Sequence, residues 1–245
     1  MTAYDSAIIA DGPVGYWMLN ETAGTVATDS MGANNGTYTG GITLGQAGIP
    51  DGSTSVKLDG AAGSYIDLGN PAALGITGDM SVEVWVKWAQ ASSFAALITK
   101  TTTNTPGPWD WYIQAGGSTP QKFFRNPASI NGTHNLGDGN WHHLIATFTG
   151  SNAAVTLYCD GASDGSSTSG APASNGSTHA RIGSRDDGAT TINGWLAKAA
   201  IYNKVLNAGQ ASAHYAAATG GGASVATIAD TRHTRARAGG KGRWH

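Results

Sequence analysis

Residues 141–161 read WHHLIATFTGSNAAVTLYCDG, and this stretch predicts two β-strands joined by a short turn. Apolar and polar side chains alternate on both sides of Gly150-Ser151-Asn152, and such period-two alternation around a Gly/Asn turn is a strong hairpin signal. One face, which includes Tyr158, is left for solvent or a partner. The side chains expected to pack inward are Leu144, Ala146, Phe148, Val155, Leu157 and Cys159.

The composition of the whole chain is that of a turn-rich, weakly charged β protein. Of 245 residues, 36 are glycine, and only 12% are charged, against the usual quarter. Eight Trp, eight Tyr and four Phe supply enough aromatic side chains for a stable core. Short strands at a spacing of roughly 8–12 residues, with two short helices, are typical of a β-sandwich, so the predicted fold class is all-β.

The strands predicted outside the hairpin are short apolar or alternating runs bounded by turn residues. They lie at 14–19, 55–58, 64–68, 80–88, 94–100, 109–114, 180–183 and 195–202. Three intervening stretches are rich in glycine and small polar residues, and we expect them to be mainly loops. They are 20–50, with turns at Asn35-Gly36 and Gly40-Gly41, then 115–140, apart from the apolar Phe123-Phe124, and 162–178.

Two helices are predicted, one near each end of the chain. The first covers 3–11 and is stopped by Gly12-Pro13. The second covers 207–218, where Asn207 serves as the N-cap and Gln210, three residues on, nearly completes a capping box.

Cys159 is the single cysteine, which excludes an internal disulfide and a cysteine-based zinc site. Its inward position in the strand predicts a buried, inert thiol. The first residues have no basic segment followed by an apolar run, and no stretch of 18 apolar residues occurs. We therefore expect a soluble protein that is made in a cytoplasm without a signal peptide and does not enter a membrane.

Charge is unevenly placed along the chain. Residues 226–245 hold five basic residues against Asp230, a sum of +4, so the total of −2 leaves −6 on the other 225 residues. The basic end predicts docking to a protein partner, with nucleic acid disfavoured and a solvated tail as a further alternative. The docking residues expected there are Arg232, Arg235, Arg237, Lys241, Arg243 and Trp244. The predicted parts of the chain are a helical lead (1–12), a β-sandwich domain (13–219), and a glycine-rich hinge with the basic tail (220–245).

Several short motifs occur in an order that resembles a known family. They are Tyr16-Trp17-Met18-Leu19, Asn34-Asn35-Gly36-Thr37, Val82-Glu83-Val84-Trp85-Val86-Lys87, Trp141-His142-His143-Leu144, Leu157-Tyr158-Cys159-Asp160-Gly161, Asn193-Gly194-Trp195 and Ile201-Tyr202. Over residues 13–216 the chain resembles the laminin-G-like domains of the concanavalin A-like superfamily. The resemblance implies a jelly roll of two antiparallel sheets with six or seven strands each. The chain departs from the pattern at Ala197-Lys198, where such domains usually have Asp, and at Cys159, where valine is common.

Both ends of the domain are similar to domains of minor tail and other virion proteins of tailed bacteriophages. The matching pieces are ADGPVGYW (10–17) and AHYAA (213–217). This resemblance implies a non-enzymatic virion protein, a minor tail protein, that is multimeric in its assembly. Its jelly roll would face outward toward host-surface polysaccharide, and its C-terminal tail would dock to other tail or capsid subunits. A capsid decoration protein is one alternative; a carbohydrate-active enzyme or a bacterial surface lectin module is another.

Catalysis is disfavoured by the distribution of acids. Glycoside hydrolases need two carboxylates on either side of the scissile bond. The chain has only two glutamates, Glu21 and Glu83, and the strand around Glu83 has no second acid. The pair Asp186-Asp187 lies beside Gly188 and is typical of a turn. We therefore expect no enzyme activity.

The resemblance makes calcium the favoured inorganic ligand, because laminin-G-like and lectin relatives often bind it through Asp, Asn and backbone carbonyls, which are hard oxygen donors. The candidate ligands lie in glycine-rich loops, where Asx-turns are the alternative interpretation. They are Asp29, Asn34, Asn35 and Asp59. His142 and His143 are adjacent in a strand and point to opposite faces, so they cannot both bind one metal from the same side.

Aromatic side chains at outward positions are candidates for sugar binding or for a protein contact. Aromatic faces flanked by polar groups suit both kinds of ligand. These residues are Trp85, which shares a face with Glu83 and Lys87, and Trp109, Trp111 and Tyr158. The alternative is that they pack within the sandwich or a subunit contact.

Overall fold

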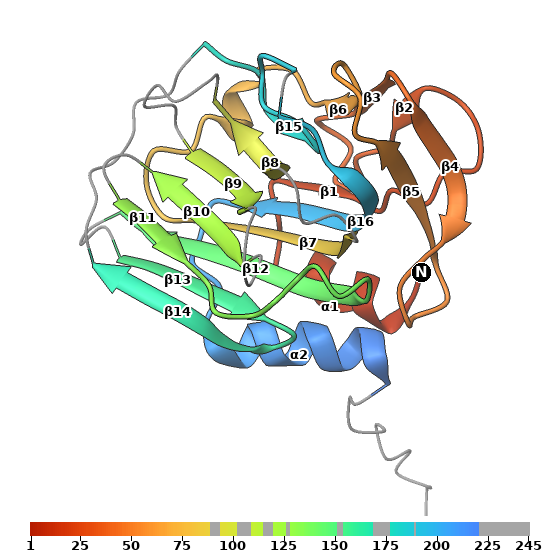
Figure 1. Cartoon of the computed structure of the whole chain (residues 1–245). Coiled ribbons are helices and arrows are strands. Elements are labelled where there is room, and N and C mark those ends of the chain that lie inside the picture. The colour runs from red at the N-terminus through yellow and green to blue at the C-terminus, as the bar shows by residue number, and fades with distance from the viewer. Residues whose placement is uncertain are drawn as a thin grey trace, which may run out of the picture.

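The computed structural model shows two antiparallel β-sheets packed face to face, with two helices against the outer face of one of them (Figure 1). The residues that the structure describes are 1–88, 94–101, 109–114, 120–125, 128–150, 154–168, 177–188 and 190–220. The predicted all-β sandwich is confirmed. Each sheet has eight strands in this part of the chain, more than the six or seven that the resemblance implied.

Sheet A carries the hairpin and the longest strands. In spatial order its strands are β14 (Ala162–Thr168), β13 (Ala154–Cys159), β12 (Trp141–Thr149), β7 (Met80–Trp88), β16 (Asn193–Tyr202), β5 (Thr54–Asp59) and β4 (Ile42–Ala47), with β1 (Gly15–Trp17) also paired to β16. In sheet B the order is β11 (Ala128–Asn131), β10 (Gln121–Arg125), β9 (Trp109–Ile113), β8 (Ala95–Lys100), β15 (Arg181–Ile182), β6 (Tyr65–Asp67), β3 (Gly36–Thr39) and β2 (Val26–Ala27). A short 3₁₀ helix spans Ala72–Leu74.

The predicted hairpin is confirmed as β12 and β13. Leu144 lies opposite Cys159 and Phe148 lies opposite Val155, so the register places the expected inward side chains on one face. All of these side chains are fully buried. The other edge of β12 pairs with β7, which makes the hairpin part of the centre of sheet A.

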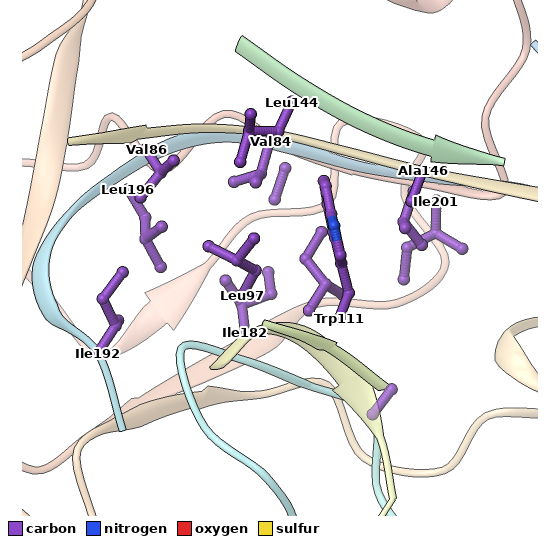
Figure 2. Close-up of a cluster of buried hydrophobic side chains, with 14 of the residues drawn as sticks. Val84, Val86, Leu97, Trp111, Leu144, Ala146, Ile182, Ile192, Leu196 and Ile201 are labelled. Carbon is purple, nitrogen blue, oxygen red and sulfur yellow. The ribbon is translucent and has the colours of Figure 1, made fainter. Parts of the chain in front are cut away.

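The main core fills the space between the two sheets (Figure 2). Branched side chains of β7, β12 and β16 point down from sheet A, and Leu97, Trp111 and Ile182 meet them from sheet B. Alternate residues of each strand therefore face this core, as period-two patterning requires. Burial of these apolar groups provides most of the favourable free energy of folding.

A second apolar cluster lies on the opposite face of sheet A, beneath helices α1 (Ala3–Ala10) and α2 (Ala208–Thr219). The helices contact each other, so α1 is part of the packed domain rather than a separate lead. Each helix begins with a capping box, Thr2 with Asp5 in α1 and Asn207 with Gln210 in α2. The expectation that this face of the hairpin is left open is wrong, because Ile145 and Tyr158 pack beneath the helices.

Six strands lie in stretches that were expected to be mainly loops: β2, β3, β4, β10, β11 and β14. The sequence of β14 is ASDGSST, which has no apolar alternation, and the strand forms by backbone pairing along β13 at the sheet edge. Gly36 begins β3 instead of a turn, and it is closely packed there, since a Cβ would lie within 3 Å of side-chain atoms of Ile66 and Leu68. The turn at Gly40 is confirmed by its left-handed backbone, with φ of 77°. Residues 151 and 152 of the predicted hairpin turn lie outside the described residues.

Candidate functional site

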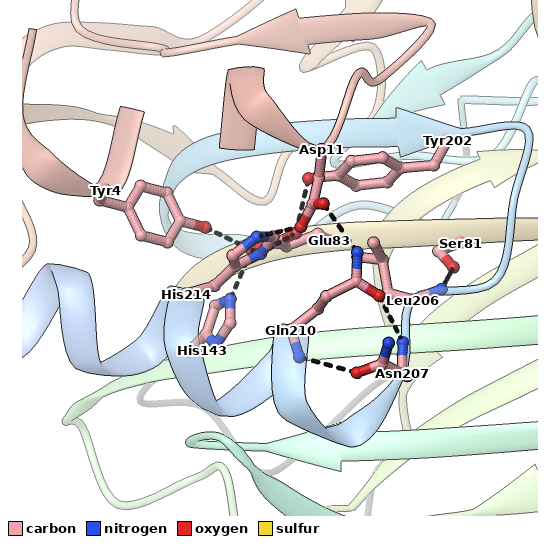
Figure 3. Close-up of polar contacts among 10 residues, drawn as sticks. All are labelled: Tyr4, Asp11, Ser81, Glu83, His143, Tyr202, Leu206, Asn207, Gln210 and His214. Atoms are coloured by element: carbon pink, nitrogen blue, oxygen red, sulfur yellow. Dashed lines mark hydrogen bonds and ion pairs between the residues drawn. The ribbon is translucent and has the colours of Figure 1, made fainter. Parts of the chain in front are cut away.

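Glu83 lies at the centre of a buried polar network between sheet A and the two helices (Figure 3). Its Oε1 accepts a hydrogen bond from the Tyr4 hydroxyl at 2.7 Å and lies 2.7 Å from Nε2 of His143. The Tyr202 hydroxyl donates to Oε2 at 2.9 Å, and Nδ1 of His214 lies 3.1 Å from both oxygens. Three strands and both helices therefore converge on one carboxylate.

The network favours an ionised Glu83 and a protonated His214. Burial by itself would raise the Glu83 pKa, but the charge of His214 and the hydrogen bonds from the two imidazoles outweigh it, so the pKa falls below its ordinary value. Burial would lower the His214 pKa, but Glu83 raises it, as does Asp11, whose Oδ2 lies 2.9 Å from Nε2. Gln210 donates to the other oxygen of Asp11 at 2.7 Å. With its oxygens occupied and no solvent access, this carboxylate has a structural role.

The expectation that Trp85 and Tyr158 face outward is wrong, because the helices cover them. Trp85 is 1% exposed and stacks on Tyr215 of α2, with ring centres 5.8 Å apart. Tyr158 is 8% exposed. A buried ring has no free face, so neither residue forms an open sugar-binding surface.

Trp109 and Trp111 are also buried, on the other side of the sandwich. They share one face of β9, and that face is the inner one, so both are fully buried in the main core. Figure 2 shows the Trp111 ring pointing between the sheets, and its Nε1 donates to Oε1 of Gln121 at 3.1 Å. The outward assignment of this strand face was therefore wrong.

The candidate calcium ligands lie in two separately hydrogen-bonded groups. The Asp29 carboxylate is buried and accepts hydrogen bonds from the backbone N–H groups of Tyr16, Met31, Ala33 and Asn34.

Asp59 accepts hydrogen bonds from the Ser64 hydroxyl at 2.7 Å and from the Ala61 N–H at 2.9 Å, and these bonds lower its pKa. These contacts match the Asx-type alternative. Asn35 accepts from the Asp29 N–H and lines the pocket described below.

His142 and His143 point to opposite faces, as expected. Nδ1 of His142 lies 2.8 Å from Asp160 and its Nε2 lies 3.1 Å from Asp138, so the ring bridges two carboxylates. The hydrogen bond to Asp160 raises the His142 pKa against the opposing effect of burial. Cys159, His142 and Asp160 lie close enough together that their ligand atoms could hold a metal ion. Burial and the nearby Asp160 raise the pKa of the Cys159 thiol well above its ordinary range.

An open pocket of about 370 Å³ lies on the outer face of sheet B. Its lining residues come from β3, β6 and the segments beside them, and the pairing of these two short strands fixes their relative positions. The lining residues are Asn35, Thr37, Thr39, Asp67, Leu68, Gly69 and His179. We call it the sheet B pocket.

The polar groups of the sheet B pocket converge on Asp67. Thr37 lies opposite Asp67 in the register of β3 and β6. Nδ1 of His179 lies 2.9 Å from one carboxylate oxygen, and the Gly69 N–H donates to the same oxygen at 2.8 Å. The side chains of His179 and Asp67 keep 47% and 25% of their exposure. Hydroxyl, amide, imidazole and carboxylate groups in one recess suit a ligand with several hydroxyl groups.

Sequence reasoning found Asn35 for a different role and missed Asp67 and His179. These two residues are 112 positions apart, and no local motif joins them. The only local signal was that Asp67 lies in the predicted strand 64–68 and that His179 directly precedes the predicted strand 180–183.

Comparison with known proteins agrees with the geometry. Residues 59–212 match the family described as the concanavalin A-like lectin/glucanases superfamily. The matched segment is more than half of the chain. The chain belongs to this superfamily. No curated protein matches the sequence significantly.

Solved structures show the same superfamily fold at low sequence identity. Trypanosoma rangeli sialidase is 13% identical, with a TM-score of 0.59, over 82% of this chain and 32% of the sialidase. The binding domain of Paraclostridial Mosquitocidal Protein 1 is 14% identical, with a TM-score of 0.64, over 84% of this chain and 52% of that structure. The chain thus spans about a third of the length of the first structure and about half of the second. At these identities the likeness concerns the fold alone.

Neither described helix has the length and apolar run that a membrane crossing requires. The predicted docking residues of the basic tail, Arg232 to Trp244, lie outside the described residues.

Proposed function

We propose that the chain is a non-enzymatic sugar-binding module and that the sheet B pocket holds the sugar. The observation that carries the proposal is the convergence of Asn35, Thr37, Asp67 and His179 on one open recess of about 370 Å³. This volume lies within the usual range for small-molecule sites. The Asp67 carboxylate accepts hydrogen bonds from vicinal hydroxyls, and the amide and imidazole supply donors. Membership of a lectin and glucanase superfamily supports the same function.

The environments of the two glutamates support a function without catalysis. Glu83 is buried with both oxygens engaged, and so it lacks access to a substrate. Glu21 accepts bonds from the Tyr38 hydroxyl and the Thr28 N–H. Asp67 in the pocket has a histidine rather than a second acid as its partner, whereas glycoside hydrolysis needs a carboxyl pair.

A binding measurement tests the sugar site. We expect hits on a glycan array, followed by calorimetry with the best ligand on wild type and Asp67→Asn. Loss of the carboxylate should weaken binding at least about tenfold, since a charged hydrogen bond contributes roughly 1.5–3 kcal/mol. Asp79→Asn is the matched control, because Asp79 is exposed and lies outside the pocket. Equal loss in both variants, or no glycan bound by the folded protein, would refute the proposal.

We further propose that the module is a virion protein of a tailed bacteriophage, with minor tail protein favoured over capsid decoration. Support comes from the motifs at 10–17 and 213–217, and from the +4 charge of residues 226–245 on an otherwise acidic chain. The tail would dock on an acidic neighbouring subunit and leave the sandwich outward. Particles assembled with Arg232, Arg235 and Arg237 changed to Gln should carry less of the protein, measured by mass spectrometry. Unchanged incorporation would exclude docking through these arginines.

A further inference from the structure

Four side chains form a row across the outer face of sheet A. Register pairing places Lys57 of β5 beside Trp195 of β16, Trp195 beside Lys87 of β7, and Lys87 beside Trp141 of β12. These strands are neighbours in sheet A (Figure 1), so the row runs across the sheet from β5 to β12. All four side chains are partly exposed. We call them the lysine–tryptophan row.

The direction of these side chains follows from their neighbours along each strand. Val56 and Leu58 on either side of Lys57 belong to the main core, as do Val86 and Trp88 on either side of Lys87. Alternation therefore turns the lysines to the outer face. Trp141 packs against the second apolar cluster beneath the helices, whereas Trp195 is not part of that cluster, so the row extends away from the helices from its Trp141 end.

Trp195 holds two ammonium groups close together. Nζ of Lys57 lies 4.8 Å from the indole centre, and Nζ of Lys87 lies 5.4 Å from it. The two charges are therefore at most 10.2 Å apart, the sum of these distances. A cation–π contact of this kind orients a lysine head without neutralising its charge. The row thus presents two positive charges around one ring.

The two lysines form no ion pair with an acid among the described residues, in contrast to three other cations of the domain. Arg181, Arg185 and Lys198 each form an ion pair with an aspartate. The 225 residues outside the basic tail carry a net charge of −6, as derived above from the sequence. Two cations without ion-pair partners in the described part of the chain, on a domain of net negative charge, form a local site that attracts an anion.

We propose that the lysine–tryptophan row binds an acidic polysaccharide, in which carboxylate or sulfate groups meet Lys57 and Lys87 and sugar rings contact Trp195 and Trp141. The row extends from β5 to β12 over three strand spacings, about 14 Å at the usual distance, which suits an extended chain better than a single small anion. The site lies on the sheet opposite the sheet B pocket and does not depend on the function proposed for that pocket.

Charge density favours a polysaccharide over nucleic acid. Nucleic-acid binding proteins commonly neutralise about 6–10 phosphates, whereas the row offers two lysines on a domain that is otherwise acidic. A ligand with widely spaced charges and apolar ring faces between them matches both the lysines and the indoles.

Indole resonances provide a test that separates the row from the tail. The full chain is labelled with ¹⁵N-tryptophan, and Trp195 is assigned by the loss of its Nε1–H signal in Trp195→Phe. A hexameric oligogalacturonate and a sulfated dextran oligomer are titrated separately, each against its neutral counterpart, the methyl ester and the unsulfated dextran. We expect at least one acidic probe to shift the Trp195 signal, with little effect of its neutral counterpart. Trp244 reports any binding by the basic tail.

Variants then test whether the two lysines of the row are responsible for the binding. Lys57→Gln combined with Lys87→Gln should weaken the Trp195 response at least tenfold, and Lys204→Gln, which removes a lysine elsewhere, should leave it unchanged. Asp67→Asn should also leave it unchanged, so that failure of this site and failure of the sheet B pocket are distinguishable. The proposal is overturned if neither acidic probe moves Trp195, if the neutral probes act equally, or if a single-stranded oligonucleotide binds the row more tightly than both acidic probes.

Discussion

Nε2 of His143 lies 2.7 Å from Oε1 of Glu83, and both side chains are buried between sheet A and the helices. His143 comes from the hairpin and Glu83 from the neighbouring strand β7. The same carboxylate also bonds Tyr4 of α1 and His214 of α2. One ionised group therefore joins the hairpin, the centre of the sheet and both helices.

Replacement of Glu83 should destabilise the whole domain. Glu83→Gln removes the negative charge but leaves the imidazoles and hydroxyls buried, and removal of one partner from a buried charged group costs about 3–5 kcal/mol. We expect a loss of this size in the free energy of unfolding measured with urea. Glu21→Gln is the matched control, because Glu21 is only half-buried and its partner Thr28 is exposed, so the loss of stability should be smaller. Equal losses in the two variants would contradict a central role for Glu83.

The pH dependence of stability follows from the shifts at His214 and Glu83. The His214 pKa is raised in the folded state, so its contribution is complete below about 6.5 and is lost as the pH rises through the folded value. The Glu83 pKa is lowered, so its contribution is complete above about 4.5 and is lost as the pH falls. Thermal unfolding should therefore show greater stability near pH 6 than near pH 8. His214→Asn should flatten the decline above pH 6, and an unchanged slope would contradict the assignment.

The core hairpin was predictable, whereas the occupant of its outer face was not. Alternation in 141–161 fixes which side chains share a face, because side chains of a strand point alternately to opposite sides. It does not show what covers each face. Tyr4 and His214, which help to cover Glu83 and Trp85, come from opposite ends of the chain. The outward assignment of Trp85 failed for this reason.

The sheet B pocket and the edge strands could not be predicted from the sequence, for related reasons. Asp67 and His179 meet because β6 and β15 pair within sheet B, which no local pattern in the sequence reveals. Strand β14 has only Asp164 buried along its length, so it lacks the apolar alternation from which strands are predicted. The capping box at Asn207 was predictable because it depends on residues only three positions apart.

Cys159 should be unreactive in the native protein. The thiol is buried, and burial together with Asp160 raises its pKa, so the reactive thiolate is scarce. We expect modification by Ellman's reagent at neutral pH to be at least about a hundredfold slower in buffer than in denaturing urea. Because the chain has one cysteine, the absorbance reports this position alone. Rapid reaction of the folded protein would contradict the burial of this side chain.

Lys198 and Asp5 should be coupled in stability. Nζ of Lys198 lies 2.6 Å from Oδ1 of Asp5, with both side chains buried, and the Tyr16 hydroxyl donates to the same oxygen at 2.6 Å. Lys198 lies where β16 shifts register against β7, and its φ of 57° is left-handed. The chain thus has a lysine in the segment where the resembling domains have Asp, and α1 supplies the acid.

Lys198→Met should cost about 3–5 kcal/mol in the free energy of unfolding, because it leaves the Asp5 charge buried without its cation. Adding Asp5→Asn should recover a large part of that loss, since a neutral amide has no uncompensated charge and can still accept the Tyr16 hydrogen bond. The coupling energy from the four proteins of this cycle, measured by urea unfolding, should exceed about 1 kcal/mol. Additive losses would show that Lys198 stabilises the register shift through its aliphatic stem rather than through Asp5. In that case Lys198→Met alone would be nearly neutral, because methionine keeps much of the apolar volume of lysine.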